Sequence, residues 1–261
     1  MASNRPKGRD VSLVVKSKTA LYGTTVVASL LIFFTIYAPA SLVFRFFQND
    51  IARLPDTRIF QITGSIWNGS ADIQFLRFPN SELSWAVVPH SLLKGYVEFA
   101  LSASGISHEL EGRFVKNGNQ ERFLGIRGVI DSKYINQVGQ YHGILLSGTL
   151  DFQNINLSID NRWFSSVSGN IDWTGGKASF QTGNGSQSVI LPPLNGEFSV
   201  KDQKLTLYVY NEDKQVLSFH LQRDGWVSLH FMSRFLSLAG LPGGGNFDPD
   251  SVIFTIEEKI L

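Results

Sequence analysis

"KLTLYVYNEDKQVLSFHLQRDGWVSLHF", residues 204–231, alternates apolar and polar side chains in three consecutive runs. Turn residues separate the runs, with "NEDK" starting at Asn211 and "RDG" starting at Arg223. An alternation with a period of two predicts half-buried strands, and short polar breaks predict hairpins between them. The stretch therefore predicts three antiparallel strands whose apolar faces hold Leu205, Leu207 and Val209, then Leu217, Phe219 and Leu221, then Val227, Leu229 and Phe231.

The same period extends through the rest of the chain after residue 44. "GYVEFALSASG", residues 95–105, places Val97, Phe99 and Leu101 on one face. In "GTLDFQNINLSI", residues 148–159, the apolar phase slips after Phe152, which predicts a bulge or turn at Gln153–Asn154. Short helices are expected only in residues 46–55, 131–141 and 233–245. The predicted fold class is mainly β: an antiparallel sheet, sandwich or groove with few short helices.

Two similar strings contain a tryptophan between glycines: "GSIWNGSADIQF", residues 64–75, and "GNIDWTGGKASF", residues 169–180. A glycine within a strand often marks a bulge or the close approach of another group. We expect Trp67 and Trp173 each to be buried over a glycine of a twisted sheet. Gly69 and Gly175 would then allow the turn that follows. These expectations make the motif glycines Gly64 and Gly169 structural residues.

The N-terminal region predicts a membrane anchor. Residues 19–44 contain no charged side chain, and Lys18 and Arg45 flank them. A helix of about 20 apolar residues spans a bilayer, and basic residues mark the cytoplasmic side. The predicted organisation is a basic cytoplasmic tail (1–18), a transmembrane helix (19–44) and a body beyond the membrane (45–261). A cleaved signal peptide ending at "APA", residues 38–40, is the alternative, but the uncharged run continues past it.

Composition excludes several kinds of chemistry. The 261 residues include no cysteine, which rules out disulfides, cysteine-bound zinc and a thiol nucleophile. After residue 18 the chain holds 18 basic and 21 acidic residues, which argues against nucleic acid as a partner. His220 and His230 are expected to lie about opposite each other, but two histidines do not complete a zinc site. We expect no catalytic residues, no metal and no cofactor.

Two segments resemble the type II secretion system protein N family, also called general secretion pathway protein N. They are "ITGSIWNGSA", residues 62–71, and "LSWAVVPHSLLKGYVEFAL", residues 83–101. The family is similar in having a tryptophan between glycines, then a tryptophan followed by an aliphatic-Pro-x-x-Leu-x-x-Gly run. The matching positions of this chain are Gly64, Trp67, Gly69, Trp85, Pro89, Leu92, Leu93 and Gly95.

The resemblance implies a single-pass protein of the bacterial inner membrane with a periplasmic β domain. Such a protein would be an accessory of type II secretion that acts by binding other secretion components, and the final strand, Ser251–Ile256, is one candidate edge for a partner. A weaker resemblance to AsmA-like β-groove proteins implies the alternative, a protein that binds or transports lipid. The two hypotheses differ in the sheet: a packed sandwich closes its apolar face, whereas a groove leaves an uncovered apolar strip.

Overall fold

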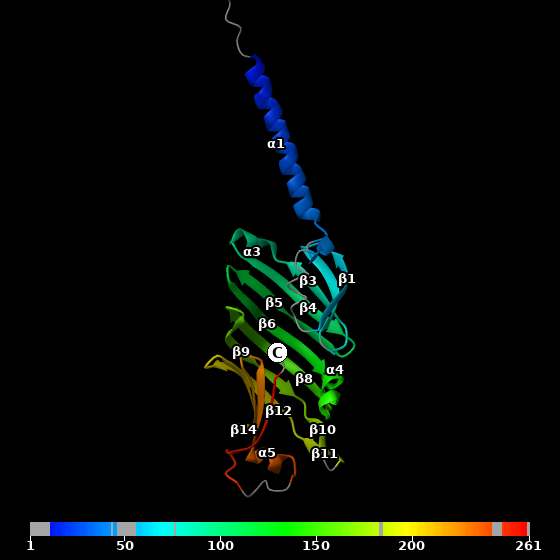
Figure 1. Ribbon diagram of the computed structural model, residues 1–261, viewed down its shortest axis with the longest axis vertical. Helices are drawn as coiled ribbons and strands as arrows, with labels where there is room; N and C mark the ends of the chain where they lie inside the picture. The colour runs from blue at the N-terminus through cyan, green and yellow to red at the C-terminus, as the bar shows by residue number, and fades with distance from the viewer. Residues whose placement is uncertain are drawn as a thin grey trace, which may run out of the picture.

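The computed structural model describes residues 11–42, 44–45, 56–75, 77–182, 185–241 and 247–259. Helix α1 spans Val11–Tyr37 and stands apart from the sheet (Figure 1). It ends at Tyr37 and not at the expected Phe44, because Pro39 cannot continue a helix and instead bridges to Ser65. Among the described residues, no helix is long and apolar enough to cross a membrane. The side chains described on α1 begin at Leu21.

Most of the chain forms one antiparallel sheet of 13 strands, in which chain order is nearly the spatial order. The sheet runs away from the lower end of α1 (Figure 1). Its strands, in spatial order, are β1 (Thr57–Gly64), β2 (Asn68–Phe75), β3 (Ser81–Val87), β4 (Val97–Gly105), β5 (His108–Asn117), β6 (Gln120–Asp131), β8 (Thr149–Asp160), β9 (Trp163–Trp173), β12 (Leu194–Lys201), β13 (Lys204–Asn211), β14 (Lys214–Leu221), β15 (Trp226–Met232) and β16 (Val252–Lys259).

A second, three-stranded sheet has the order β11-β10-β7. It consists of β7 (Ile144–Leu146), β10 (Gly176–Thr182) and β11 (Gly185–Leu191). The remaining helical segments are short: α3 (Pro89–Leu93), α4 (Ser132–Gly139), the 3₁₀ turn η1 (Gln140–His142) and α5 (Ser233–Leu238). In Figure 1, α5 and the small sheet lie at the end of the molecule far from α1.

The strand register gives the large sheet one continuous apolar face. Residues paired directly across antiparallel strands project to the same side. Following these pairs from β2 to β16 passes through small or apolar residues only: Ala71, Leu83, Ala103, Leu110, Gly128, Phe152, Ile171, Gly196, Val209, Leu217, Phe231 and Phe254. We call this set the apolar row.

The main core covers only part of this face. It lies where the small sheet and α5 meet the C-terminal half of the large sheet, and it contains Trp173, Ala178, Leu191, Leu194, Val216 and Ala239. Within the described residues, the large sheet has no second sheet of matching size against it. The architecture is therefore a groove and not a closed sandwich.

Several expected elements are present. The three strands of residues 204–231 are β13, β14 and β15, with the expected apolar faces in register. The register shifts between Gln153 and Asn156, as the phase slip at Gln153–Asn154 predicted, and Asn154 has a φ of 50°. The helix predicted in 131–141 is α4, whose first turn is capped by the Asp131 side chain 2.8 Å from the Lys133 amide nitrogen. The helix predicted in 233–245 is shorter, α5 ending at Leu238.

Residues 46–55, where another short helix was expected, lie outside the described residues. Helix α3 was not expected, although Pro89 supplies its signal because proline suits the first turn of a helix.

Candidate ligand-binding groove

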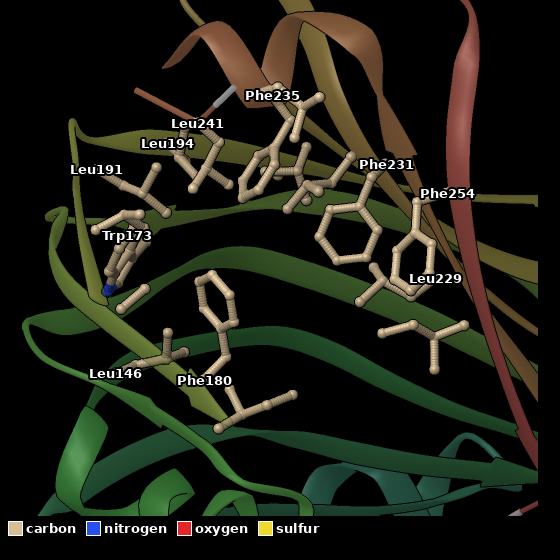
Figure 2. A pocket seen from close by; sticks show the side chains of 18 of the residues that line it. Leu146, Trp173, Phe180, Leu191, Leu194, Leu229, Phe231, Phe235, Leu241 and Phe254 are labelled. Carbon is tan, nitrogen blue, oxygen red and sulfur yellow. The ribbon is translucent and has the colours of Figure 1, made fainter. Parts of the chain in front are cut away.

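A cavity of about 640 Å³ lies between the large sheet, the small sheet and α5. Its floor is the C-terminal part of the apolar row, with Ile171, Gly196 and Val209 among the contributors. Figure 2 shows Leu146, Phe180 and Leu191 of the small sheet facing Leu229 and Phe231 of the large sheet across this space. We call it the distal cavity because it lies at the end of the sheet far from α1.

The wall of the distal cavity is almost purely apolar. Of the described residues that line it, Ser179 and Gln181 alone have polar side chains, apart from the indole of Trp173, and none is charged. A surface of this kind offers neither ion pairing nor more than a few hydrogen bonds to a ligand. Its chemistry is suited to a long aliphatic group, because burial of apolar area supplies the binding free energy.

Trp173 combines the apolar wall with a satisfied polar atom. The side chain is 8% exposed, and its indole N–H donates a hydrogen bond to the Ser147 carbonyl, 2.9 Å away. A glycine is needed at position 148, because its φ is 92° and an added Cβ would lie 2.4 Å from the Gly175 carbonyl oxygen and 3.1 Å from the Trp173 indole nitrogen. The expectation that Trp173 is buried over a glycine is thus met, with Gly148 as the glycine.

One side of the distal cavity is open to solvent. Phe254 and Ile256 of β16 line it yet are 57% and 40% exposed, and Ile144 on β7 is 39% exposed. Phe254 packs at 5.7 Å, ring centre to ring centre, from Phe231 (Figure 2). Because these rim side chains are apolar and accessible, an apolar molecule can enter between β16 and the small sheet.

A second cavity of about 410 Å³ lies on the same face near α1. The residues that line it are all apolar and come from β1 to β5 and from the segment after α1: Ala40, Phe44, Ile59, Ile62, Ile66, Ala71, Ile73, Leu83, Trp85, Phe99, Leu101 and Phe114. Ala71 and Leu83 belong to the apolar row, which places both cavities on one face of the large sheet.

The first tryptophan string is arranged differently from the prediction. Trp67 is half-buried in the β1–β2 turn, and the ring over Gly69 belongs to Trp85, the cross-strand partner of Gly69. A Cβ on Gly69 would lie 2.6 Å from Cζ2 of Trp85. The Trp85 indole N–H donates to the Ser65 carbonyl, 3.2 Å away. Trp67 is therefore not buried as expected, and the ring over Gly69 is that of Trp85, because the register brings it to that position.

The remaining motif residues lie at turns and strand ends, except Gly169, which lies inside β9. Gly64 has a φ of 79° at the end of β1, and Gly95 has a φ of 82° just after α3. Pro89 begins α3, where Leu92 is exposed. Gly169 lies in β9 at a φ of 113°, where a Cβ would come within 2.6 Å of the Cα of Ile155.

The histidines form no catalytic or metal site that the described residues reveal. His220 and His230 lie with ring centres 4.7 Å apart, diagonally and not directly opposite, because His220 pairs with Ser228. His220 contacts Thr206 and Ser218 at 3.0 Å each. Burial, the neighbouring His230 and Lys204 lower the pKa of His220. Within the part of the chain described, no cluster of three or more potential metal ligands occurs.

His108 is a buried histidine that sequence reasoning did not single out. It is 7% exposed, and its ring lies 4.3 Å, centre to centre, from the ring of Tyr134 on α4. Neither ring nitrogen has a hydrogen-bond partner among the described residues. Burial lowers the pKa of His108 because the charged form is disfavoured away from water. Its place on the apolar phase of β5, two residues before Leu110, was the available signal.

Comparison with known proteins identifies the family. The model of type II secretion system (T2SS), protein N matches residues 56–237 of this 261-residue chain. The matched region extends from β1 into α5 and includes both tryptophan strings and most of the apolar row. Among curated proteins and among solved structures, nothing matches the chain. The chain belongs to the type II secretion system protein N family.

Proposed function

We propose that this type II secretion component is anchored in the bacterial inner membrane by α1, with its β body in the periplasm, and acts by binding and not by catalysis. The uncharged run of residues 19–44 and the basic flank before it support the anchor and its direction. Large apolar side chains of α1 are exposed, with Leu21, Phe34 and Tyr37 at 64%, 61% and 66%, so the described part of the chain leaves them free to face lipid.

We further propose that the ligand is an acyl chain of a lipid, held in the distal cavity. The observation that carries this proposal is a cavity of about 640 Å³ with an almost wholly apolar wall and an apolar open rim. This volume is within the range of about 300–1,000 Å³ typical of small-molecule sites. A peptide strand fits less well, because its backbone N–H and C=O groups would find few partners in such a wall.

The test is to purify the full chain from its native membrane in a non-lipid detergent and to quantify lipid that remains bound by mass spectrometry. A photo-crosslinking amino acid at Phe180, which faces the cavity, should attach to acyl chains in cells (Figure 2). Roughly one lipid per chain is expected, and a purified chain free of lipid and of acyl crosslinks would contradict the proposal.

A matched pair of substitutions on β16 tests whether lipid binds in the distal cavity or elsewhere on the surface. Phe254→Asp places a carboxylate on the apolar rim, whereas Thr255→Asp changes the neighbouring residue, which does not line the cavity. Phe254 is already 57% exposed, so the substitution leaves the core intact. An unpaired polar group against the acyl chain costs about 1–3 kcal/mol, and a carboxylate at least as much, so the affinity should fall by roughly 5- to 150-fold or more. Equal lipid retention by the two variants would refute a site in this cavity.

A second candidate function is the binding of another secretion component at a sheet edge. Among the described strands, β16 is the last of the large sheet and pairs with β15 alone, and most of its residues are exposed. An unpaired strand edge can accept a strand from a partner. A photo-crosslinker at Thr255 should then capture a secretion component in cells. If the crosslinker at Thr255 captured a secretion component and the crosslinker at Phe180 captured no lipid, this second function would be favoured over lipid binding.

A further inference from the structure

Helix α3 lies at the end of the large sheet where the chain leaves α1 (Figure 1). Backbone hydrogen bonds connect the two regions. The amide of Ile66 in the β1–β2 turn donates to the carbonyl of Ala38, 3.1 Å away, just past the end of α1. In the same turn, the carbonyl of Trp67 accepts from the amide of Val87, at 2.7 Å, two residues before α3 begins. The exit of α1 and the start of α3 are thus joined through one turn.

Ser91 fixes the orientation of α3. It is 0% exposed, and its hydroxyl donates to the Val88 carbonyl at 2.7 Å and accepts from the Glu98 amide at 3.2 Å. The Ser91 carbonyl also accepts from the amides of Lys94 and Tyr96. These bonds tie the inner side of α3 to the start of β4, so the residues on its outer side are held in place.

The outer side of α3 presents two adjacent leucines to solvent. Leu93 is 90% exposed and Leu92 is 41% exposed. His90 and Lys94, which flank the pair, are exposed as well. Segments that lie in a membrane interface combine aliphatic side chains at the acyl boundary with basic side chains at the lipid phosphates. The fixed leucine pair beside Lys94 has this combination.

We propose that Leu92 and Leu93 insert into the bilayer surface from which α1 emerges, with Lys94 at the lipid headgroups. This inference rests on the proposed anchoring by α1, because only an anchor brings this end of the sheet to the membrane. The contact is too small to hold the protein in the membrane alone. It fixes the tilt of the large sheet, and it keeps the cavity that contains Ala40 and Phe44 close to the bilayer.

The absence of cysteine from the sequence makes the test direct. Single cysteines at Leu93→Cys, Leu30→Cys and Ile106→Cys are labelled with nitrobenzoxadiazole in the full chain, reconstituted into phosphatidylcholine–phosphatidylglycerol vesicles. Leu30 lies on α1 and reports whether the anchor is inserted. Ile106 is the matched control, a fully exposed aliphatic residue at 106%, in the turn beyond the opposite end of β4. Lipids that carry a nitroxide on the acyl chain quench only labels in contact with the bilayer.

The expected result is quenching at Leu30 and at Leu93, with the Leu93 label quenched at least about twofold more than the Ile106 label. Quenching at Leu30 with equal, weak quenching at Leu93 and Ile106 would overturn the inference and leave the anchor standing. No quenching at Leu30 would overturn the anchoring and this inference together. Because the vesicles contain only this chain and lipid, a quenched Leu93 label also excludes a protein partner as the cause.

Discussion

Replacing Trp173 by alanine should destabilise the β body more than any other single tryptophan truncation in the described residues. The side chain is 8% exposed and packs in the main core, and its N–H satisfies the Ser147 carbonyl at 2.9 Å. Truncation of a buried tryptophan costs about 3–5 kcal/mol, partly because the neighbours only partly refill the space. Trp173→Phe keeps much of the ring but leaves the Ser147 carbonyl without this donor, at about 1–3 kcal/mol.

The assay is thermal and denaturant unfolding of the full chain in detergent. A domain of this size loses about 2–4 °C of Tm per kcal/mol, so Trp173→Ala should lower the Tm by roughly 6–20 °C. Trp226→Ala is the control, because Trp226 is 42% exposed on β15 and lies outside the core, and its cost should stay near 0.5 kcal/mol. If Trp173→Ala and Trp226→Ala had the same Tm, the stability of the core would not depend on Trp173.

Three further predictions concern His108, Gly69 and the membrane topology of the chain. Burial lowers the pKa of His108 below 6.5, so the unfolded chain binds a proton on this residue more readily than the folded chain. The contribution of neutral His108 to the free energy of unfolding is therefore complete above pH 6.5 and decreases as the pH falls below it. His108→Phe should flatten that decrease in a series of urea midpoints measured from pH 7.5 to 5. Gly69→Ala should cost about 1–3 kcal/mol in thermal unfolding, because its Cβ would lie 2.5 Å from the Thr63 carbonyl oxygen. Gly118→Ala is the control: nothing lies within 4 Å of its Cβ, so only the smaller strain of its positive φ should appear. Alkaline phosphatase fused after Leu261 should be active in whole cells, and a well-expressed but inactive fusion would contradict the periplasmic placement of the body.

The strands could be predicted from the sequence because their signal is local. Each run of alternating residues in 204–231 carries its own period, and the polar breaks at Asn211 and Arg223 mark the hairpins. The last strand was also expected at an edge, because a glycine-rich segment precedes it, and β16 is the final strand in the order of the large sheet. Cross-strand register is not local in this sense. Trp67 is the tryptophan nearest to Gly69 in sequence, but pairing of β2 with β3 brings Trp85 over it instead.

The cavity could not be predicted from alternation, because alternation says which side chains share a face and not what covers that face. The cover over the distal cavity comes from strands that interrupt the order of the large sheet: β7 lies between β6 and β8 in the chain, and β10 and β11 lie between β9 and β12. The second tryptophan string extends from the end of β9 into β10, so Trp173 and Gly175 mark the point where the chain leaves the large sheet to build that cover. The first string spans the β1–β2 turn and β2, and its Ser65 is bridged to Pro39, two residues after the end of α1.

The two regions share an arrangement that is wider than the strings themselves, because Trp85 and Gly148 lie outside residues 64–75 and 169–180. At both junctions an indole N–H donates to a backbone carbonyl of a connecting segment, Trp85 to Ser65 and Trp173 to Ser147. At both, a glycine lies close to that indole: a Cβ on Gly69 would collide with Trp85 at 2.6 Å, and a Cβ on Gly148 would lie 3.1 Å from the Trp173 nitrogen and collide with the Gly175 carbonyl oxygen. A junction between a sheet and another unit exposes backbone groups that no neighbouring strand can pair. A tryptophan satisfies such a group and still presents an apolar surface to the groove, and a smaller side chain does not do both.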